Sequence, residues 1–187
     1  LRRAFEIVDV DQQRRLALLP CLQGSWGRSS FSPDGRWLAT CDLRAVRVWD
    51  TSSWQSVGDL FDGVDSPHDI AWSPDSTKLA ACDAEGQVLV WNAADQELRR
   101  KFRPHVDACY RLAWHPDGKR LATASADHTV SIANLGTGGI ESVRGSGNSV
   151  LSLAWDAQGA LTSTSKDGSI RRWNVDQTKP HVRRQIQ

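Results

Sequence analysis

A segment that recurs every 41 or 42 residues is the feature that most constrains how this chain can fold. Its copies begin at Phe31, Trp72, Trp114 and Trp155 and read FSPDGRWLAT, WSPDSTKLAA, WHPDGKRLAT and WDAQGALTST. A second marker is centred 18 or 19 residues after each start, as Val48-Trp49-Asp50, Val90-Trp91-Asn92, Ile132-Ala133-Asn134 and Arg172-Trp173-Asn174. A fixed period of about 20 to 50 residues indicates repeated units that bury a core against their neighbours.

Each repeat has the pattern of four short β-strands. In the third repeat, Tyr110 to Trp114 alternates large and small or polar residues, and His115-Pro116-Asp117-Gly118 then supplies the residue types of a tight turn. Arg120 to Ala124 returns, and Thr129 to Ala133 has three apolar residues in five and no charged one, as burial on both faces favours. A more polar fourth strand is clearest at Glu97 to Phe102 of the preceding repeat.

Four-stranded units of about 40 to 45 residues without helical periodicity stack radially as the blades of a β-propeller. The Trp49-Asp50 pair, its variants Trp91-Asn92 and Trp173-Asn174, and the Ser-Pro-Asp-Gly turn resemble those of WD-repeat proteins. The predicted fold class is therefore all-β: one WD-repeat β-propeller domain over residues 1–187, with four WD-type four-stranded blades. We place the blades at residues 23–61, 62–103, 104–144 and 145–187, after the outer two strands of a preceding blade in residues 1–22.

This blade count predicts an open arc or part of a larger propeller, because no inner strand pair completes the partial blade at the N-terminus. Two explanations stay open. A longer parent chain supplies further blades, or two copies associate to close the ring. The position of Leu1 in the middle of a blade favours the longer parent.

Composition narrows the classes of partner. Lys and Arg total 23 and Asp and Glu total 22, giving a net charge of +1 and a pI near 7.9, so no field of one sign is available to attract nucleic acid or an anionic membrane. No apolar run approaches the roughly 18 residues of a membrane span. Cys21, Cys41, Cys82 and Cys109 are far apart, which favours free thiols in a reducing, cytoplasmic compartment.

The resemblance implies a structural hydrogen-bond network in each blade. In the family it runs from a His before the first strand, through Ser or Thr and Asp, to the Trp of the third strand. In the third repeat His105, Ser125 and Asp127 fit this network, but Ala133 stands at the Trp position. The other matching positions are Ser165, Asp167 and Trp173, where Ser146 replaces His; Glu85 and Trp91, where Gly63 replaces His; and Trp49.

Catalytic and metal-binding alternatives fit the sequence less well. A Ser, a His and an Asp could form a hydrolase triad, but the set recurs in defective copies and no G-x-S-x-G elbow exists. The histidines, His68, His105, His115, His128 and His181, lack the spacing of metal ligands. The glycines at 136–139 and 145–147 lack a following Lys-Ser or Lys-Thr and a helix, so they indicate loops rather than a nucleotide site. We therefore predict no enzyme, no metal and no cofactor.

The resemblance also implies a partner-binding face, made where the loops before each first strand meet the loops between second and third strands. Carried over by position, that face contains Gln23, Ser25, Asp42, Val64, Ser66, Val106, Ala108, Gly147, Ser149 and Lys166. Trp54 lies outside the two repeated Trp positions and is the best candidate for an exposed anchor.

Two functions are consistent with this sequence. The leading hypothesis is a non-catalytic scaffold that presents a preformed face to a protein or peptide. The alternative is a regulatory or sensing domain of a larger enzyme, such as a bacterial protein kinase or a nucleotide-driven switch, to which WD repeats are often fused.

Overall fold

The computed structural model of the chain contains only β-strands in the part that it describes, residues 4–21, 28–43, 45–60, 63–144, 146–173 and 175. There is no helix in these residues that could cross a membrane. The strands are β1 (Ala4–Asp9), β2 (Arg14–Pro20), β3 (Arg28–Phe31), β4 (Trp37–Cys41), β5 (Val46–Asp50), β6 (Ser56–Leu60), β7 (Pro67–Trp72), β8 (Lys78–Asp83), β9 (Val88–Asn92), β10 (Leu98–Phe102), β11 (Cys109–Trp114), β12 (Arg120–Ser125), β13 (Thr129–Asn134), β14 (Ile140–Arg144), β15 (Val150–Trp155), β16 (Leu161–Ser165) and β17 (Ile170–Trp173).

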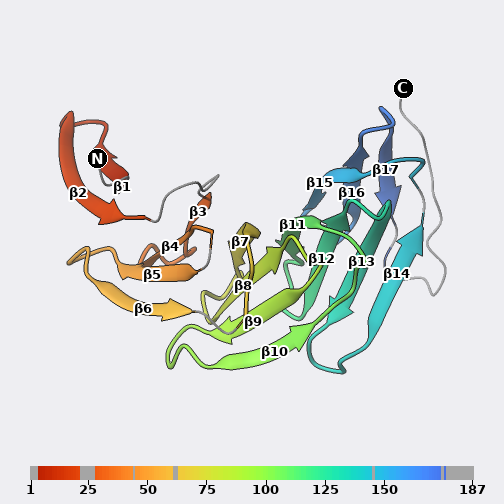
Figure 1. Cartoon of the computed structure of the whole chain (residues 1–187), viewed down its shortest axis with the longest axis horizontal. Coiled ribbons are helices and arrows are strands. Elements are labelled where there is room, and N and C mark those ends of the chain that lie inside the picture. The colour runs from red at the N-terminus through yellow and green to blue at the C-terminus, as the bar shows by residue number, and fades with distance from the viewer. Residues whose placement is uncertain are drawn as a thin grey trace.

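These strands form five antiparallel sheets in chain order. We call β1–β2 the hairpin, β3–β6 blade 1, β7–β10 blade 2, β11–β14 blade 3 and β15–β17 blade 4. The sheets follow one another along an open arc, with the hairpin at one end and blade 4 at the other (Figure 1). This confirms the predicted fold class. The fourth strand predicted for blade 4 falls largely outside the described residues.

The tight turn between the first and second strands of each blade has a local cause. In blade 1 the Ser32 hydroxyl donates to Asp34 at 2.5 Å and accepts from the Trp37 amide at 2.9 Å, while Gly35 adopts a φ of 72°. Blade 2 repeats the arrangement, with the Ser73 hydroxyl 2.6 Å from Asp75. The Ser-Pro-Asp-Gly pattern thus satisfies the backbone of the turn before any packing against a neighbour.

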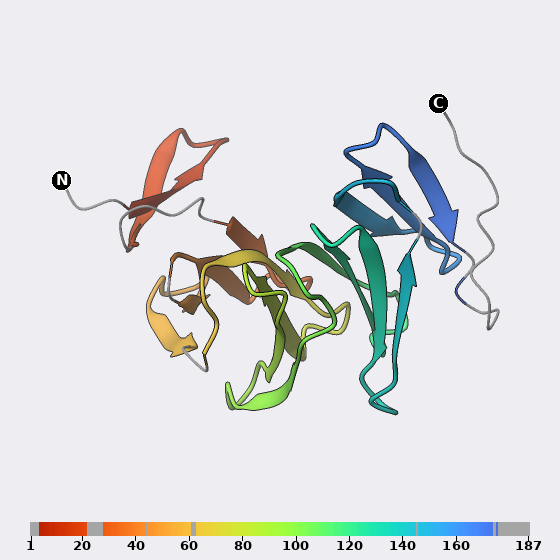
Figure 2. The same ribbon diagram turned by 45° about the vertical axis from the view of Figure 1, so that its right-hand side comes forward.

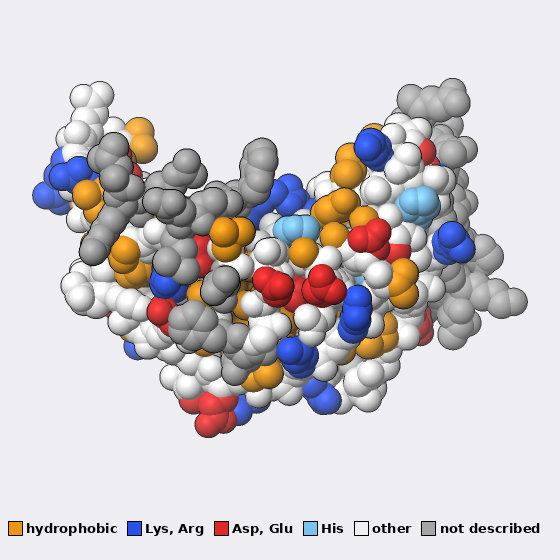
Figure 3. Space-filling model, viewed as in Figure 1, with side chains coloured by type: hydrophobic (Ala, Val, Ile, Leu, Met, Phe, Trp, Pro, Cys, Tyr) orange, Lys and Arg blue, Asp and Glu red, His pale blue; other side chains and the backbone are white. Residues whose placement is uncertain are grey.

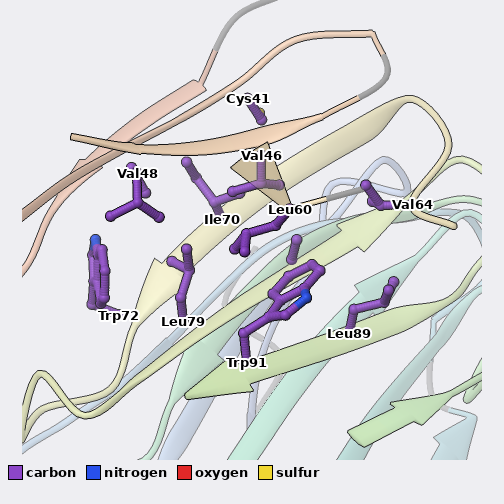
Figure 4. Packing of buried hydrophobic residues seen from close by; sticks show 12 residues of the cluster. Cys41, Val46, Val48, Leu60, Val64, Ile70, Trp72, Leu79, Leu89 and Trp91 are labelled. Carbon is purple, nitrogen blue, oxygen red and sulfur yellow. The ribbon is translucent and has the colours of Figure 1, made fainter. Parts of the chain in front are cut away.

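The core lies between blades. Figure 4 shows blade 1 packed on blade 2, with Val46 and Val48 facing Ile70 and Trp72. Two similar clusters join blade 2 to blade 3 and blade 3 to blade 4. The face that each of blades 1 to 3 presents to the next blade uses small or branched apolar residues: Ala39, Cys41, Val46 and Val48; Ala80, Cys82, Val88 and Val90; Ala122, Ala124, Val130 and Ile132. Large side chains of the next blade fill the space above these small ones.

A repeated indole hydrogen bond also joins successive blades. Trp72 donates to the Ser30 carbonyl at 2.9 Å, Trp114 to the Ala71 carbonyl at 3.0 Å and Trp155 to the Ala113 carbonyl at 3.0 Å. Each bond therefore runs from the last residue of a first strand to the first strand of the preceding blade. Blade 1 has Phe31 at this position, and its side chain is 56% exposed.

The two ends of the arc differ chemically. Among the described residues the hairpin packs on blade 1 through Leu19, which contacts Leu38 and Trp49. Its other face leaves Val8, Leu16 and Leu18 between 39% and 52% exposed. In blade 4, the positions that face the next blade in blades 1 to 3 are occupied by Thr162, Thr164, Ile170 and Arg172. This outward face of blade 4 is polar where the equivalent faces are apolar.

Candidate functional site

The innermost strands of the blades enclose a hollow of about 790 Å³ on the concave side of the arc. Its lining residues are Arg28, Asp42, Leu43, Ser66, Pro67, His68, Tyr110, Arg111, Ser149, Leu151 and Lys166. All four blades contribute to this hollow. In Figure 3 the margin between the two ends of the arc carries histidine and Lys or Arg side chains beside hydrophobic ones, and Figure 2 shows the same arc from a second direction.

A register shift at the same aligned position directs three of these side chains into the hollow. In β7, β11 and β15 the pairing with the second strand shifts between Pro67 and Asp69, between Cys109 and Arg111, and between Val150 and Ser152. The residues passed over are His68, Tyr110 and Leu151, and each of them lines the hollow. A β-bulge turns the extra side chain out of the regular alternation, which is how a strand otherwise committed to blade packing presents a residue to a ligand.

His68 and Tyr110 form an aromatic wall across two blades. Their rings stack with centroids 5.8 Å apart and an interplanar angle of 28°. His68 Nδ1 lies 3.2 Å from the Cys109 carbonyl, which can only accept, so Nδ1 carries a proton and donates. The orientation of the imidazole is thereby fixed by the backbone of the neighbouring blade, and Nε2 is left as its second polar atom.

The position directly after His68 and Tyr110 carries a charge whose sign alternates between blades. It is occupied by Arg28, Asp69 and Arg111 in the first three blades. Asp69 accepts a hydrogen bond from the Leu112 amide at 3.1 Å. Burial raises the pKa of Asp69, against the opposing effects of the Leu112 amide, Arg111 and Arg28. The carboxylate interacts electrostatically with both arginines and offsets part of their charge.

The predicted partner-binding face is found only in part at the hollow. Asp42, Ser66, Ser149 and Lys166 line it. Val64 is buried at 5% exposure in the core between blades 1 and 2, and Val106 is 86% exposed but does not line the hollow. Gly147 and Ala108 also lie outside the lining. Gln23 and Ser25 are outside the described residues.

Asp42 belongs to the lining of the hollow although it is buried. It is only 3% exposed, and its carboxylate lies 2.9 Å from Arg47 Nη1. Its carboxylate therefore stabilises blade 1 through this ion pair, and the residue also borders the hollow. Trp54, predicted to be an exposed anchor, is instead half-buried. It packs with Leu19, Leu38 and Trp49, because the hairpin covers the loop in which it lies.

The residues that sequence reasoning missed are Arg28, Leu43, Pro67, His68, Tyr110, Arg111 and Leu151. Most of them belong to the first strands, for which the alternation of large and small or polar residues predicted two unequal faces but no binding position. The position four residues before each first-strand Trp changes from His68 to Tyr110 to Leu151, but the positions on either side of it vary as well, so the repeat alone did not single it out.

Blade 3 shows how the predicted structural network is built. His105 Nδ1 lies 3.1 Å from Asp127 and 3.0 Å from the Thr129 hydroxyl, and its Nε2 lies 2.8 Å from the Thr123 hydroxyl. Burial would raise the pKa of Asp127, but the Thr129 hydroxyl and His105 outweigh it and hold the pKa below its usual value. The hydroxyl beside His105 is thus that of Thr123 and not the expected Ser125, which donates to the Ala108 carbonyl at 2.9 Å.

Blades 1 and 4 hold the remaining half of this network. Trp49 donates to the Thr40 hydroxyl and Trp173 to the Ser163 hydroxyl, each at 2.9 Å. Thr40, Thr123 and Ser163 are equivalent in the strand register, because each lies two residues after the Leu that pairs with the end of the first strand. Blade 3 therefore keeps the His and its hydroxyl, while blades 1 and 4 keep the hydroxyl and its Trp.

In blades 2, 3 and 4 an acidic residue at the turn between second and third strands accepts backbone hydrogen bonds. Hydrogen bonds from Ser169 and from the Gly147 amide lower the pKa of Asp167, and Arg171 lies 3.4 Å from its carboxylate. In blade 2 Asp83 accepts from the Glu85 and Gln87 amides, whereas the Glu85 side chain is exposed. Glu85 therefore does not take the place expected for it, because Asp83 occupies that place from the strand end.

These networks do not have the form of a catalytic site. His105 is 2% exposed and Thr123 1%, so the hydroxyl beside the imidazole cannot reach a substrate. Ser125 is fully buried and bonded to backbone carbonyls. Within the described residues, no group of three or more His, Cys, Asp or Glu side chains is arranged to hold a metal ion. His181 falls outside these residues.

Known proteins with similar sequences contain the same type of repeat. The family model for the WD domain, G-beta repeat, matches residues 24–50, 60–92, 96–134 and 140–174. The chain is 30% identical over 148 residues to WD repeat-containing protein 1 of Bos taurus, an alignment that covers 78% of this chain and 18% of that protein. It is 34% identical over 94 residues to Protein HIR1 of Yarrowia lipolytica, covering 40% of this chain and 9% of that protein. WD repeat-containing protein VIP3 of Arabidopsis thaliana is 27% identical over 115 residues, covering 53% of this chain and 36% of that protein. The chain thus spans less than two thirds of the length of these relatives.

Proposed function

The chain belongs to the WD40 family, and we propose that it is a non-catalytic scaffold which binds a protein partner in the hollow on the concave side of its blades. Membership supports a protein-interaction role in general. The observation that carries the finer proposal is the set of three bulges at one aligned position, which direct His68, Tyr110 and Leu151 into a single hollow.

The physical basis is a preformed surface. The bulged residues belong to strands that are held on both sides, by the second strand of their own blade and by the neighbouring blades. A partner therefore meets groups whose backbone is already ordered, and the entropic cost of association is reduced. The free thiols Cys21, Cys41, Cys82 and Cys109 support the further prediction of a reducing, cytoplasmic setting.

The test is affinity capture from a cell lysate with the full chain and two variants. Leu151→Glu introduces a charge into the hollow, where Leu151 is 44% exposed. Val57→Glu is the matched control, since Val57 is 39% exposed on β6, away from the hollow. We expect bound proteins that are lost with Leu151→Glu and kept with Val57→Glu. Capture that both variants leave unchanged would refute binding in the hollow.

A further inference from the structure

The lining of the hollow carries an excess of positive charge. It contains three cationic side chains, Arg28, Arg111 and Lys166, and among the described residues none of them lies within ion-pair distance of a carboxylate. Carboxylates oppose this charge only in part. Asp42 of the lining is paired with Arg47 of its own blade at 2.9 Å, and the buried Asp69 offsets part of the charge of Arg111 and Arg28. The chain as a whole has a net charge of only +1, so this excess is a property of the hollow and not of the composition.

Apolar surface lies beside these cations. Leu43 is 40% and Leu151 44% exposed, although both belong to a chain that buries most of its large aliphatic residues. The Tyr110 ring adds a flat amphipathic surface between blades 2 and 4. Arg111 is held close by, because its Nη1 donates to the Tyr110 carbonyl at 3.0 Å. Cationic and apolar side chains therefore line the same hollow.

The size of the hollow suits a short stretch of chain. A volume of about 790 Å³ admits a few side chains, and its four-blade rim is open to solvent rather than closed over. A folded domain could not enter it, whereas an extended segment could lay successive side chains against different blades.

We infer that the hollow binds an extended acidic peptide segment of the partner protein, with carboxylates beside Arg28, Arg111 and Lys166 and apolar side chains against Leu43 and Leu151. The inference rests on the proposed function and adds the chemical class of the partner. Arginine is well suited to this role because its planar guanidinium binds a carboxylate through two parallel hydrogen bonds.

The experiment uses fluorescence anisotropy with the full chain and a labelled peptide of alternating Glu and Leu. The same peptide with Gln in place of Glu keeps the length and the apolar residues and removes the charge. We expect the Glu peptide to bind at least about tenfold more tightly, and its affinity to fall as salt is raised. Poly-L-glutamate serves as a second probe that contains no apolar residue.

Two double variants separate the site from net charge. Arg28→Gln with Arg111→Gln removes the two arginines of the hollow, and Lys119→Gln with Arg144→Gln removes two exposed charges outside the lining. Both lower the net charge equally, and thermal melts by circular dichroism check that each folds. We expect the first variant to weaken binding of the Glu peptide by about tenfold or more, and the second to leave it unchanged.

Each remaining outcome overturns the inference in a distinguishable way. Equal binding of the Glu and Gln peptides, lost with Leu151→Glu, would leave the proposed function standing and reject the acidic partner. Failure of both the Glu peptide and poly-L-glutamate to bind would also reject it, and lysate capture would then decide the proposed function separately. Tighter binding of single-stranded oligouridylate, dependent on Arg28 and Arg111, would assign the hollow to nucleic acid instead.

Discussion

Replacing Trp114 by Phe tests whether the repeated indole hydrogen bond holds successive blades together. Trp114 is 8% exposed and donates to the Ala71 carbonyl of blade 2 at 3.0 Å. Losing that bond costs about 1 kcal/mol, and losing the part of the buried indole that phenyl does not fill costs about 1–2 kcal/mol more. We therefore expect Trp114→Phe to lower the free energy of unfolding by about 2–3 kcal/mol.

The assay is urea unfolding of the full chain followed by circular dichroism. With a slope of about 2 kcal/mol per molar urea, the expected loss shifts the midpoint by about 1 M. Phe31→Trp is the matched reverse change, because Phe31 holds the same repeat position at 56% exposure. Among the described residues no first strand of a preceding blade lies beside it to supply a carbonyl. The reasoning is refuted if Trp114→Phe stays within about 0.5 kcal/mol of the wild type, or if Phe31→Trp changes stability as much.

Three further predictions concern the blades. Thr123→Val removes the hydroxyl 2.8 Å from His105 Nε2 and leaves a buried polar atom without its partner, so urea unfolding should show a loss of about 1–3 kcal/mol that Thr123→Ser restores; an unchanged midpoint would contradict the network. Gly86→Ala should cost clearly more than Gly168→Ala in the same assay: both positions have positive φ, 76° and 83°, but a Cβ at Gly86 would lie 2.5 Å from the Asp107 carbonyl oxygen, whereas at Gly168 it meets open space. Equal losses for the two would show that the blade contact relaxes freely. For Asp75, burial opposes ionisation, but hydrogen bonds from Ser73 and Thr77 outweigh it and lower the pKa to about 2. Since the folded pKa lies below the unfolded value, its stabilisation is complete above about pH 4 and is lost as the pH falls toward 2. Asp75→Asn should therefore be less stable than the wild type at pH 6, with a difference that shrinks at pH 2.5; a constant difference would refute this linkage.

The sequence was sufficient for the blades because their packing is periodic. The two markers in phase predicted each first and third strand, and the strands β11, β12 and β13 lie within one residue of the ranges expected at each end. Every unit repeats the same local solution, so one repeat with clear turns constrains the others.

The hollow could be predicted only in part, because it depends on departures from that periodicity. Alternation alone places Tyr110 beside a blade core, whereas the bulge before Arg111 turns it toward the arc's concave side. The exchange of Ser125 for Thr123 beside His105 has a similar cause. Both hydroxyls lie on one face of β12, and only the depth reached by the imidazole decides between them.

The polar outward face of blade 4 has a consequence for polymerisation. In an array of stacked repeats, the outward face of the last repeat resembles the faces that pack inside the array, so it can pack on the first repeat of another copy. Head-to-tail contacts that do not close into a ring generate filaments. Here the exposed Val8 and Leu18 of the hairpin would meet a face of a second copy in which Ile170 is the apolar member beside Thr162, Thr164 and Arg172. Arg172 lies 2.7 Å from Asp156, and such a contact would remove this ion pair from water while Ile170 alone on that face gained apolar contact. Among the described residues, these two faces are therefore poorly matched for a head-to-tail contact between copies of the arc.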